Sequence, residues 1–149
     1  MPSAIGDADL LEIAEACVIL CLGELVRLGR IVPAEVNGRW HIRISADKLV
    51  KRGLTGAVTL DGQHRAVMYL TSELTIEGLM HVIAHEVVHL AQICRGDLIP
   101  KYGYQVWRGE PYPTLTADDP DYFSHQPWEV EAKALQPILL RVLQAKFSA

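Results

Sequence analysis

The segment TIEGLMHVIAHEVVHLAQICR, residues 75–95, decides how the rest of the sequence is interpreted. Its apolar residues recur at the spacing of a helix, and Gly96 is suited to end that helix. Within it lies His85-Glu86-Val87-Val88-His89, whose two histidines are one helical turn apart. Side chains at this spacing are about 6 Å apart along the helix and project from one face. Both imidazoles can therefore bind one metal ion.

Glu86 is offset from the two imidazoles, too far around the helix to be an equal third ligand beside them. From this position its carboxylate can accept a proton from a water molecule bound to the metal. The alternative interpretation is a helix that carries two ordinary surface or core histidines. The apolar neighbours argue against it, because buried imidazoles and a buried carboxylate need partners. The motif therefore predicts a zinc site with Glu86 as the catalytic base.

Two histidines leave a catalytic zinc ion one protein ligand short. The downstream candidates for that ligand are His125, Glu129 and Glu131, with Asp118, Asp119 and Asp121 as weaker alternatives. Glu129 and Glu131 lie in PWEVEA, residues 127–132, at the start of a predicted last helix, where carboxylates are also favoured as ordinary first-turn residues. On a helical wheel both flank the apolar face, and the periodicity slightly favours Glu131.

The combination of HEVVHLAQ at residues 85–92 with a later PWEVEA helix resembles the gluzincin-type zinc metallopeptidases. It is similar in particular to small phage and bacterial metallopeptidases that carry HExxHxxQ and a terminal PWExEA segment. The resemblance covers residues 75–135 and implies that Glu129 is the third ligand. Many gluzincins have an aspartate four residues after that glutamate, where this chain has Lys133. The carboxylate that would orient a histidine must then come from elsewhere or be absent.

The resemblance implies a zinc-dependent peptidase of peptide or protein substrates. His85, His89 and Glu129 would hold Zn²⁺, and Glu86 would be the catalytic base. It also implies that an edge strand, for which residues 57–70 are the candidate, binds the peptide by strand addition. Two alternatives remain open. One is a non-catalytic, zinc-stabilised interaction module whose site is closed by His125 or Glu131, and the other is a metal-dependent hydrolase of a non-peptide bond.

The rest of the chain predicts a small α+β, zincin-like domain. A long helix over residues 9–29, buried on most sides, precedes a strand at 40–45 and strands at 57–60 and 66–70, the last two joined at Asp61-Gly62. These strands suggest a small antiparallel sheet. Residues 96–126 are rich in proline and tyrosine and predict a long structured loop. The last helix starts near Pro127, runs toward Phe147, and is expected to kink or break near residues 133–136 because of Pro137.

Several other residues are candidates for supporting roles. A donor to the developing oxyanion is expected in or near the long loop, where Tyr122 and His125 are closest to the proposed third ligand and Tyr102, Tyr104 and Tyr112 are alternatives. His81 lies one turn before His85 and is interpreted as a packing or supporting residue. His41 and His64 are interpreted as surface residues.

Composition limits the classes of function. The chain has 149 residues, of which 50% are hydrophobic, so a single domain over residues 1–149 is expected. Its 14 basic and 18 acidic residues give a net charge of −4, which disfavours nucleic-acid binding. The longest apolar run, residues 16–22, is too short for a membrane span, and the first residues do not resemble a secretory signal. Cys17, Cys21 and Cys94 form no CxxC pair, which favours core residues and a reducing, cytoplasmic location. So short a chain could also depend on a protein partner for specificity.

Overall fold

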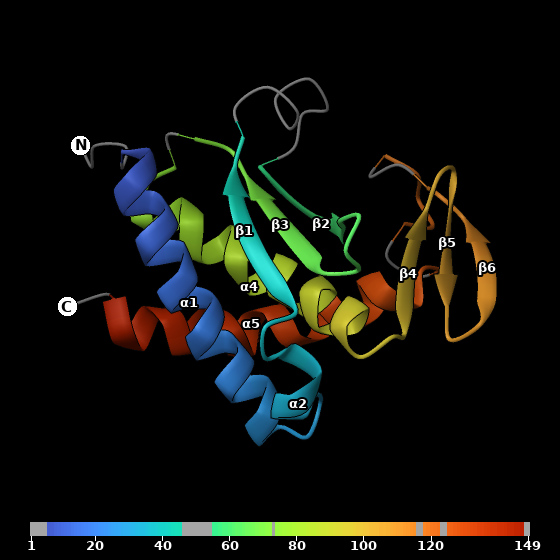
Figure 1. Cartoon of the computed structure of the whole chain (residues 1–149), viewed down its shortest axis with the longest axis horizontal. Coiled ribbons are helices and arrows are strands. Elements are labelled where there is room, and N and C mark those ends of the chain that lie inside the picture. The colour runs from blue at the N-terminus through green and yellow to red at the C-terminus, as the bar shows by residue number, and fades with distance from the viewer. Residues whose placement is uncertain (1–5, 46–54, 73, 116–117, 123–124, 148–149) are drawn as a thin grey trace.

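The structure is a computed structural model that describes residues 6–45, 55–72, 74–115, 118–122 and 125–147. Its elements, in chain order, are α1 (Asp7–Arg27), α2 (Pro33–Val36), β1 (Trp40–Ile44), β2 (Gly56–Leu60), β3 (Ala66–Leu70), α4 (Ile76–Cys94), β4 (Leu98–Lys101), β5 (Tyr104–Trp107), β6 (Glu110–Pro113) and α5 (Pro127–Phe147). Three long helices and two small sheets make up the fold (Figure 1). The predicted α+β class is confirmed.

The predicted N-terminal helix is α1, and the expectation that it is buried on most sides is wrong. One face is buried and consists of Leu10, Ala14, Cys17, Val18, Cys21, Leu22 and Leu25. The other face is open to solvent, and the side chain of Ile19 on it is 61% exposed. Gly29 follows the helix with a φ of 73°, a left-handed conformation that glycine adopts without strain and that stops the helix near the predicted position.

The first sheet has the strand order β1-β3-β2. The predicted hairpin is confirmed, because β2 and β3 pair antiparallel, with Val58 opposite Met68. The carboxylate of Asp61 stabilises its turn by accepting hydrogen bonds from the backbone N–H groups of Gln63 and Arg65. The expectation of a fully antiparallel sheet is wrong, because β1 pairs parallel to β3. Strand β3 is the central strand, with β1 on one edge and β2 on the other.

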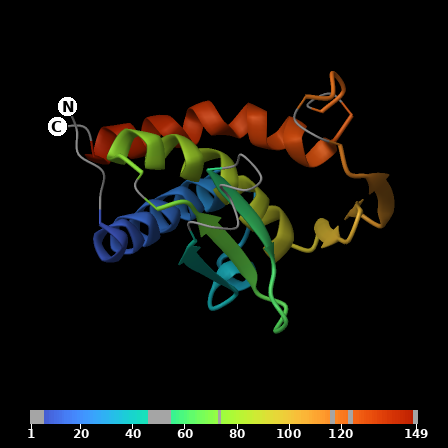
Figure 2. The same cartoon turned by 90° about the horizontal axis from the view of Figure 1, so that it is seen from above.

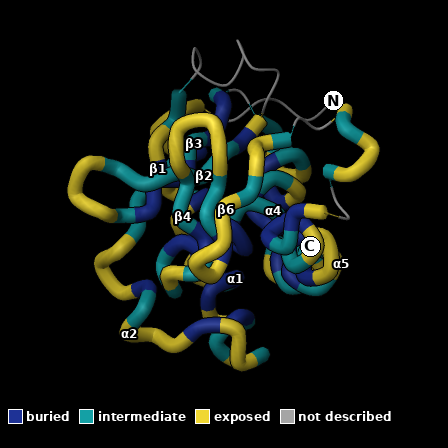
Figure 3. Tube along the Cα trace, turned by 90° about the vertical axis from the view of Figure 1, so that its right-hand side faces the viewer, coloured by how far each residue is buried: buried dark blue, intermediate teal, exposed yellow. Residues whose placement is uncertain are grey.

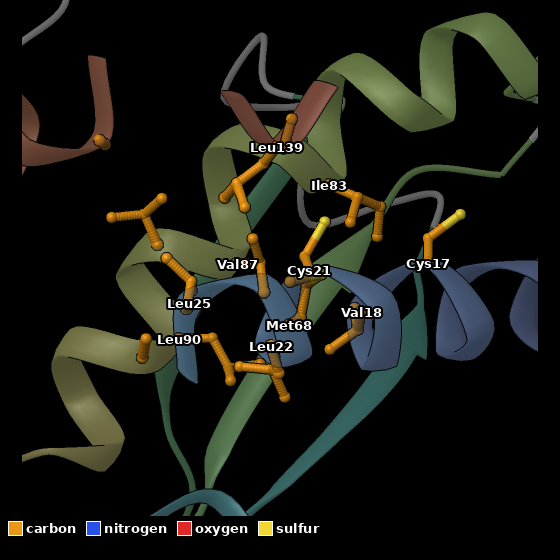
Figure 4. Close-up of a cluster of buried hydrophobic side chains, with 14 of the residues drawn as sticks. Cys17, Val18, Cys21, Leu22, Leu25, Met68, Ile83, Val87, Leu90 and Leu139 are labelled. Carbon is orange, nitrogen blue, oxygen red and sulfur yellow. The ribbon is translucent and has the colours of Figure 1, made fainter. Parts of the chain in front are cut away.

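Helix α4 lies between α5 and the first sheet (Figure 2). Its first turn is capped by Thr75, whose side-chain oxygen accepts a hydrogen bond from the backbone N–H of Gly78. Eleven of its residues are buried, and the buried stretches of the chain gather at the centre of the molecule around α4 (Figure 3). The main core joins all three long helices and β3, as seen for Cys21, Met68, Val87 and Leu139 in Figure 4. The helix that carries HEVVH is therefore held on several sides.

The stretch predicted as a long loop contains a second sheet, the antiparallel meander β4-β5-β6. Each strand is only four residues long, and prolines occur in two of them, so the pattern of the sequence did not predict strands. Two aromatic residues of this stretch pack against α5. The rings of Trp107 and Tyr112 lie 6.3 and 5.4 Å from that of Trp128, at the start of α5.

The last helix, α5, runs without interruption from Pro127 to Phe147, so the predicted break near residues 133–136 is wrong. Proline removes one backbone hydrogen bond from a helix, and Pro137 lies on the exposed side, where water can satisfy the carbonyl group that loses its partner.

None of the described helices is long and apolar enough to cross a membrane.

Candidate metal centre

The structure brings His85 and His89 of α4 together with Glu129 of α5. One potential ligand atom from each residue lies within 4.8 Å of the others. The Nε2 atom of His89 is 2.8 Å from Oε1 of Glu129, and Nε2 of His85 is 3.2 Å from Oε2. The two Nε2 atoms are themselves 3.2 Å apart. This arrangement follows from the packing of α4 along α5, which aligns the HEVVH turn with the first turn of α5.

Two glutamines set the orientation of the two imidazole rings. The Nδ1 atom of His89 is 2.8 Å from Oε1 of Gln92, and Nδ1 of His85 is 3.0 Å from Oε1 of Gln136. An amide oxygen can only accept a hydrogen bond, so both Nδ1 atoms must carry a proton. In a neutral imidazole the lone pair then lies on Nε2. Both lone pairs are thus directed to the space beside Glu129.

This geometry fits a zinc ion. Two Nε2 lone pairs and a carboxylate face one another. Oε2 of Glu129 is buried, and its contact with Nε2 of His85 at 3.2 Å becomes a hydrogen bond only when that nitrogen carries a proton. Groups that are all electron-pair donors repel one another unless a cation or protons lie between them. Ligand atoms around a tetrahedral zinc ion are about 3.3 Å apart when the bonds are about 2.0 Å long. The measured separations of 2.8 and 3.2 Å are close to that value.

Without a metal, protons take the place of the cation. Burial lowers the pKa of His89, but its hydrogen bond with Glu129 and the nearby charges of Glu86 and Glu129 outweigh burial and raise this pKa to about 9. Burial raises the pKa of Glu129, but hydrogen bonds with His85 and His89 outweigh it and lower this pKa to about 2. The carboxylate is therefore ionised at neutral pH, as a metal ligand must be.

Glu86 lies beside the cluster and is not part of it. Its side chain is half-buried, and burial raises its pKa, although the nearby histidines act in the opposite direction. A carboxylate with a raised pKa is a stronger base than an exposed one. Strand β2 begins close to it. A Cβ atom on Gly56 would lie only 2.5 Å from Cγ1 of Val82 and 3.1 Å from Cγ of Glu86. Glycine at position 56 thus lets β2 lie against the turn that carries Glu86.

Glu131, which helical periodicity slightly favoured, lies away from the cluster. Its carboxylate accepts hydrogen bonds from Arg95 at 2.8 Å, Gln92 at 2.9 Å and Arg30 at 3.3 Å. The helical wheel was misleading because it does not show which neighbours surround α5. Arg30 and Arg95 lie beside Glu131, whereas the two histidines of α4 lie beside Glu129. His125 is exposed and pairs with Asp121 at 3.2 Å. Among the described residues, the aspartates at 118, 119 and 121 do not belong to the metal-binding group.

Among the candidate oxyanion donors, Tyr122 is the one that contacts the cluster. Its hydroxyl group donates a hydrogen bond to Oε1 of Glu129 at 3.3 Å. The side chains of Tyr102 and Tyr104 are exposed on the meander, while Tyr112 packs on Trp128. Among the remaining histidines, His81 is exposed, so its expected role as a packing or supporting residue is wrong, and His64 is exposed as predicted. His41 is half-buried, with Nε2 3.1 Å from Oδ2 of Asp61.

Sequence reasoning missed the two orienting glutamines. Because position 133 is a lysine, the sequence left open which group would orient a histidine. In the structure, amide oxygens of two glutamines lie beside the Nδ1 atoms of His85 and His89, where a carboxylate was expected. Both positions carry a signal in the sequence. Gln92 lies one turn after His89 and is the last residue of HEVVHLAQ, whereas Gln136 lies two turns after Glu129 on the same face of α5.

Comparisons of the chain with protein-family models, with curated proteins and with solved structures gave no match.

Proposed function

We propose that this chain is a zinc-dependent metallopeptidase in which His85, His89 and Glu129 hold Zn²⁺. The observation that carries the proposal is the meeting of two oriented imidazoles and an ionised carboxylate beside the half-buried Glu86. A zinc ion bound there would polarise a carbonyl group and lower the pKa of a water molecule. The side chains of this chain then have to move protons and hold the substrate.

Glu86 is the proposed general base. It follows His85 in α4, is not one of the three clustered residues, and has a raised pKa because it is buried. In the proposed reaction its carboxylate accepts a proton from the attacking water and passes it to the leaving amine. A site that only stabilised the fold would not need such a base.

The edge of the first sheet supports a peptide as the substrate. Strand β2 is an outer strand of that sheet among the described strands, and it begins beside Glu86. An extended peptide that paired with this edge would lie next to the proposed base, with its main chain held by hydrogen bonds. Tyr122 is the proposed donor to the oxyanion. Burial, together with the nearby Glu129, raises its pKa, so the hydroxyl group keeps its proton.

The proposed location is a reducing compartment such as the cytoplasm. Cys17, Cys21 and Cys94 are all free thiols, and a free-thiol chain is typical of such a compartment.

The test compares the zinc-loaded protein with its Glu86→Gln variant on a mixture of unstructured peptides, with cleavage followed by mass spectrometry. We expect wild type to cleave and the variant to bind zinc equally while losing turnover by a factor of at least about 100. Glu77→Gln changes an exposed glutamate in the first turn of the same helix and should leave turnover unchanged. Zinc-loaded wild type that cleaves no peptide would contradict the peptidase and leave the interaction module or the non-peptide hydrolase.

A further inference from the structure

A second candidate site lies on the other side of α5 from the metal centre. It is a pocket of about 610 Å³ between α5 and the β4-β5-β6 meander, and its walls include Arg30, Trp107, Arg108, Tyr112 and His125. None of the residues of the metal centre lines it. We propose that this pocket binds a small organic anion, a carboxylate or a phosphate ester that is carried on an apolar or aromatic group. The proposal is independent of the peptidase proposal.

The charges around the pocket favour an anion. Two arginines and a histidine line it. Their carboxylate partners are Glu131, Asp97 and Asp121, of which Glu131 alone is a lining residue. This balance contrasts with the net charge of −4 of the whole chain. A guanidinium group has five N–H donors, and the ion pairs of Arg30 with Glu131 and of Arg108 with Asp97 are both 3.3 Å long. Their side chains are 50% and 63% exposed, so donors remain open to a ligand.

The cations are held in position before any ligand binds. The guanidinium group of Arg108 lies over the ring of Trp107, 4.9 Å from its centre, and Trp107 itself packs on Trp128. On the other side, Glu131 is fixed by Arg95 and Gln92, and it in turn contacts Arg30. Groups that are already ordered lose less conformational entropy when a ligand binds. The pocket thus has an anion-binding rim, formed by Arg30 and Arg108, whose side chains are already held by their neighbours.

The remaining walls are apolar and indicate the second part of the ligand. The rings of Trp107 and Tyr112 line the pocket, together with Val130, Ala134 and Leu135 of α5. Val130 is 48% exposed and is therefore accessible to an apolar group of a ligand. A bare inorganic anion would use the rim and leave these walls wet. An aromatic or aliphatic group attached to the anion would cover them.

Isothermal titration calorimetry of the zinc-loaded protein tests the proposal with two probes, N-benzoylglycine and phenyl phosphate. Each probe joins a phenyl ring to one anionic group, a carboxylate on an amide-linked arm in N-benzoylglycine and a phosphate ester in phenyl phosphate, so binding of either shows a class of anion that the pocket accepts. We expect at least one to bind with a dissociation constant below about 1 mM. Benzamide, the neutral control, and inorganic phosphate, the control without an apolar group, should each bind at least about tenfold more weakly.

Two test variants, each with a matched control, locate the binding. Ala134→Trp fills the pocket and should abolish binding, whereas Ala145→Trp places the same bulk at an exposed position of α5 outside the pocket. Arg108→Gln should weaken binding at least about tenfold, and Arg43→Gln, on β1, should not change it. Absence of saturable binding would overturn the proposal. So would binding that Ala134→Trp leaves intact, which would place the anion elsewhere, for instance on the zinc ion. Circular dichroism of each variant confirms that it is folded. Ala134→Trp changes the volume of the pocket and Arg108→Gln changes its charge, so each variant tests the proposal separately.

Discussion

The Nδ1 atom of His89 lies 2.8 Å from Oε1 of Gln92, whose amide nitrogen lies 2.9 Å from both the carbonyl oxygen of Trp128 and Oε1 of Glu131. This one buried glutamine joins a proposed metal ligand on α4 to the first turn of α5. Because its amide group donates to two fixed acceptors, its oxygen is directed at His89. Glu131 does not belong to the metal-binding group, but through Gln92 it helps to orient His89, which does.

Replacing Gln92 by methionine tests this link. Methionine has a similar length and removes all three hydrogen bonds, so His89 loses its orientation and two buried acceptors lose a donor. We expect zinc affinity to fall roughly 10–100-fold and the free energy of unfolding to fall by about 1–3 kcal/mol. Chelator competition and urea unfolding measure the two effects. Gln144→Met, at an exposed position of α5, is the control. Unchanged zinc affinity in Gln92→Met would contradict the orienting role.

Zinc binding should depend on pH with a defined sign. The pKa of His89 in the metal-free protein is raised to about 9, so at neutral pH zinc must displace a proton from it. We therefore expect affinity to rise with pH up to about 9 and then to level off. Calorimetry at pH 7 in buffers of different ionisation enthalpy should show proton release. Zinc binding that is independent of pH and releases no proton would contradict the geometry described for His89.

The stability of the metal-free protein should change in the opposite direction. A pKa raised by folding stabilises the protein below the pKa of the unfolded chain, which is about 6.5 for histidine, and this stabilisation is lost as pH rises through the folded value. For His89 the loss falls between about 6.5 and about 9. Denaturant unfolding of the metal-free protein across that range should show it. His89→Gln, which cannot titrate, should lose most of this slope.

Gly56→Ala should disturb the proposed base without touching a metal ligand. The added Cβ would lie 2.5 Å from Cγ1 of Val82 and 3.1 Å from Cγ of Glu86, so the strand or these side chains must move. We expect a loss of about 1–3 kcal/mol in stability and a lower kcat, with zinc affinity retained. Gly23→Ala, in α1, is the control. Its Cβ would meet nothing within 4 Å, so it should stabilise the protein by up to about 1 kcal/mol. A Gly56→Ala variant that kept its stability and kcat would contradict the role of the close contact between β2 and the turn of α4 that carries Glu86.

The three thiols should react slowly in the folded protein. Burial raises the pKa of Cys17 and Cys94 to about 11 and, with smaller contributions from Cys17 and Glu24, raises that of Cys21 to about 12. Almost no thiolate is then present at pH 8. Labelling with a disulfide reagent should become fast only in denaturant. Fast labelling of the native protein would contradict the packing of α1 and α4.

Local patterns predicted the parts of the fold that depend on neighbouring residues. The apolar spacing around HEVVH predicted α4, and the Asp61-Gly62 turn predicted the β2–β3 hairpin, because helical periodicity and turn chemistry act over a few residues. The parallel pairing of β1 with β3 depends on how distant segments are arranged in space. The alternation of apolar residues over residues 40–45 does not encode that arrangement. The β4-β5-β6 meander was not predicted for a similar reason. Its strands are short and hold their shape by packing Trp107 and Tyr112 on Trp128.

The same distinction applies to the candidate site. The spacing of His85, Glu86 and His89 is a property of one helix and was visible in the sequence. Which glutamate of α5 meets them depends on the rotation of α5 about its axis, which is set by packing along the whole helix. Helical periodicity alone placed Glu129 and Glu131 on opposite borders of the apolar face. The resemblance to gluzincins favoured Glu129, and the structure places Glu129 beside the histidines and Glu131 among arginines.

X-ray absorption at the zinc edge, combined with zinc stoichiometry, tests the central claim most directly. On the zinc-loaded protein we predict one zinc per chain, with two imidazole nitrogens, a carboxylate oxygen and one further oxygen from water. Glu129→Ala and His85→Ala should each lose zinc binding, while Glu131→Ala should keep it. A sulfur ligand, four protein ligands, or a Glu129→Ala variant that binds zinc as wild type does would contradict the account.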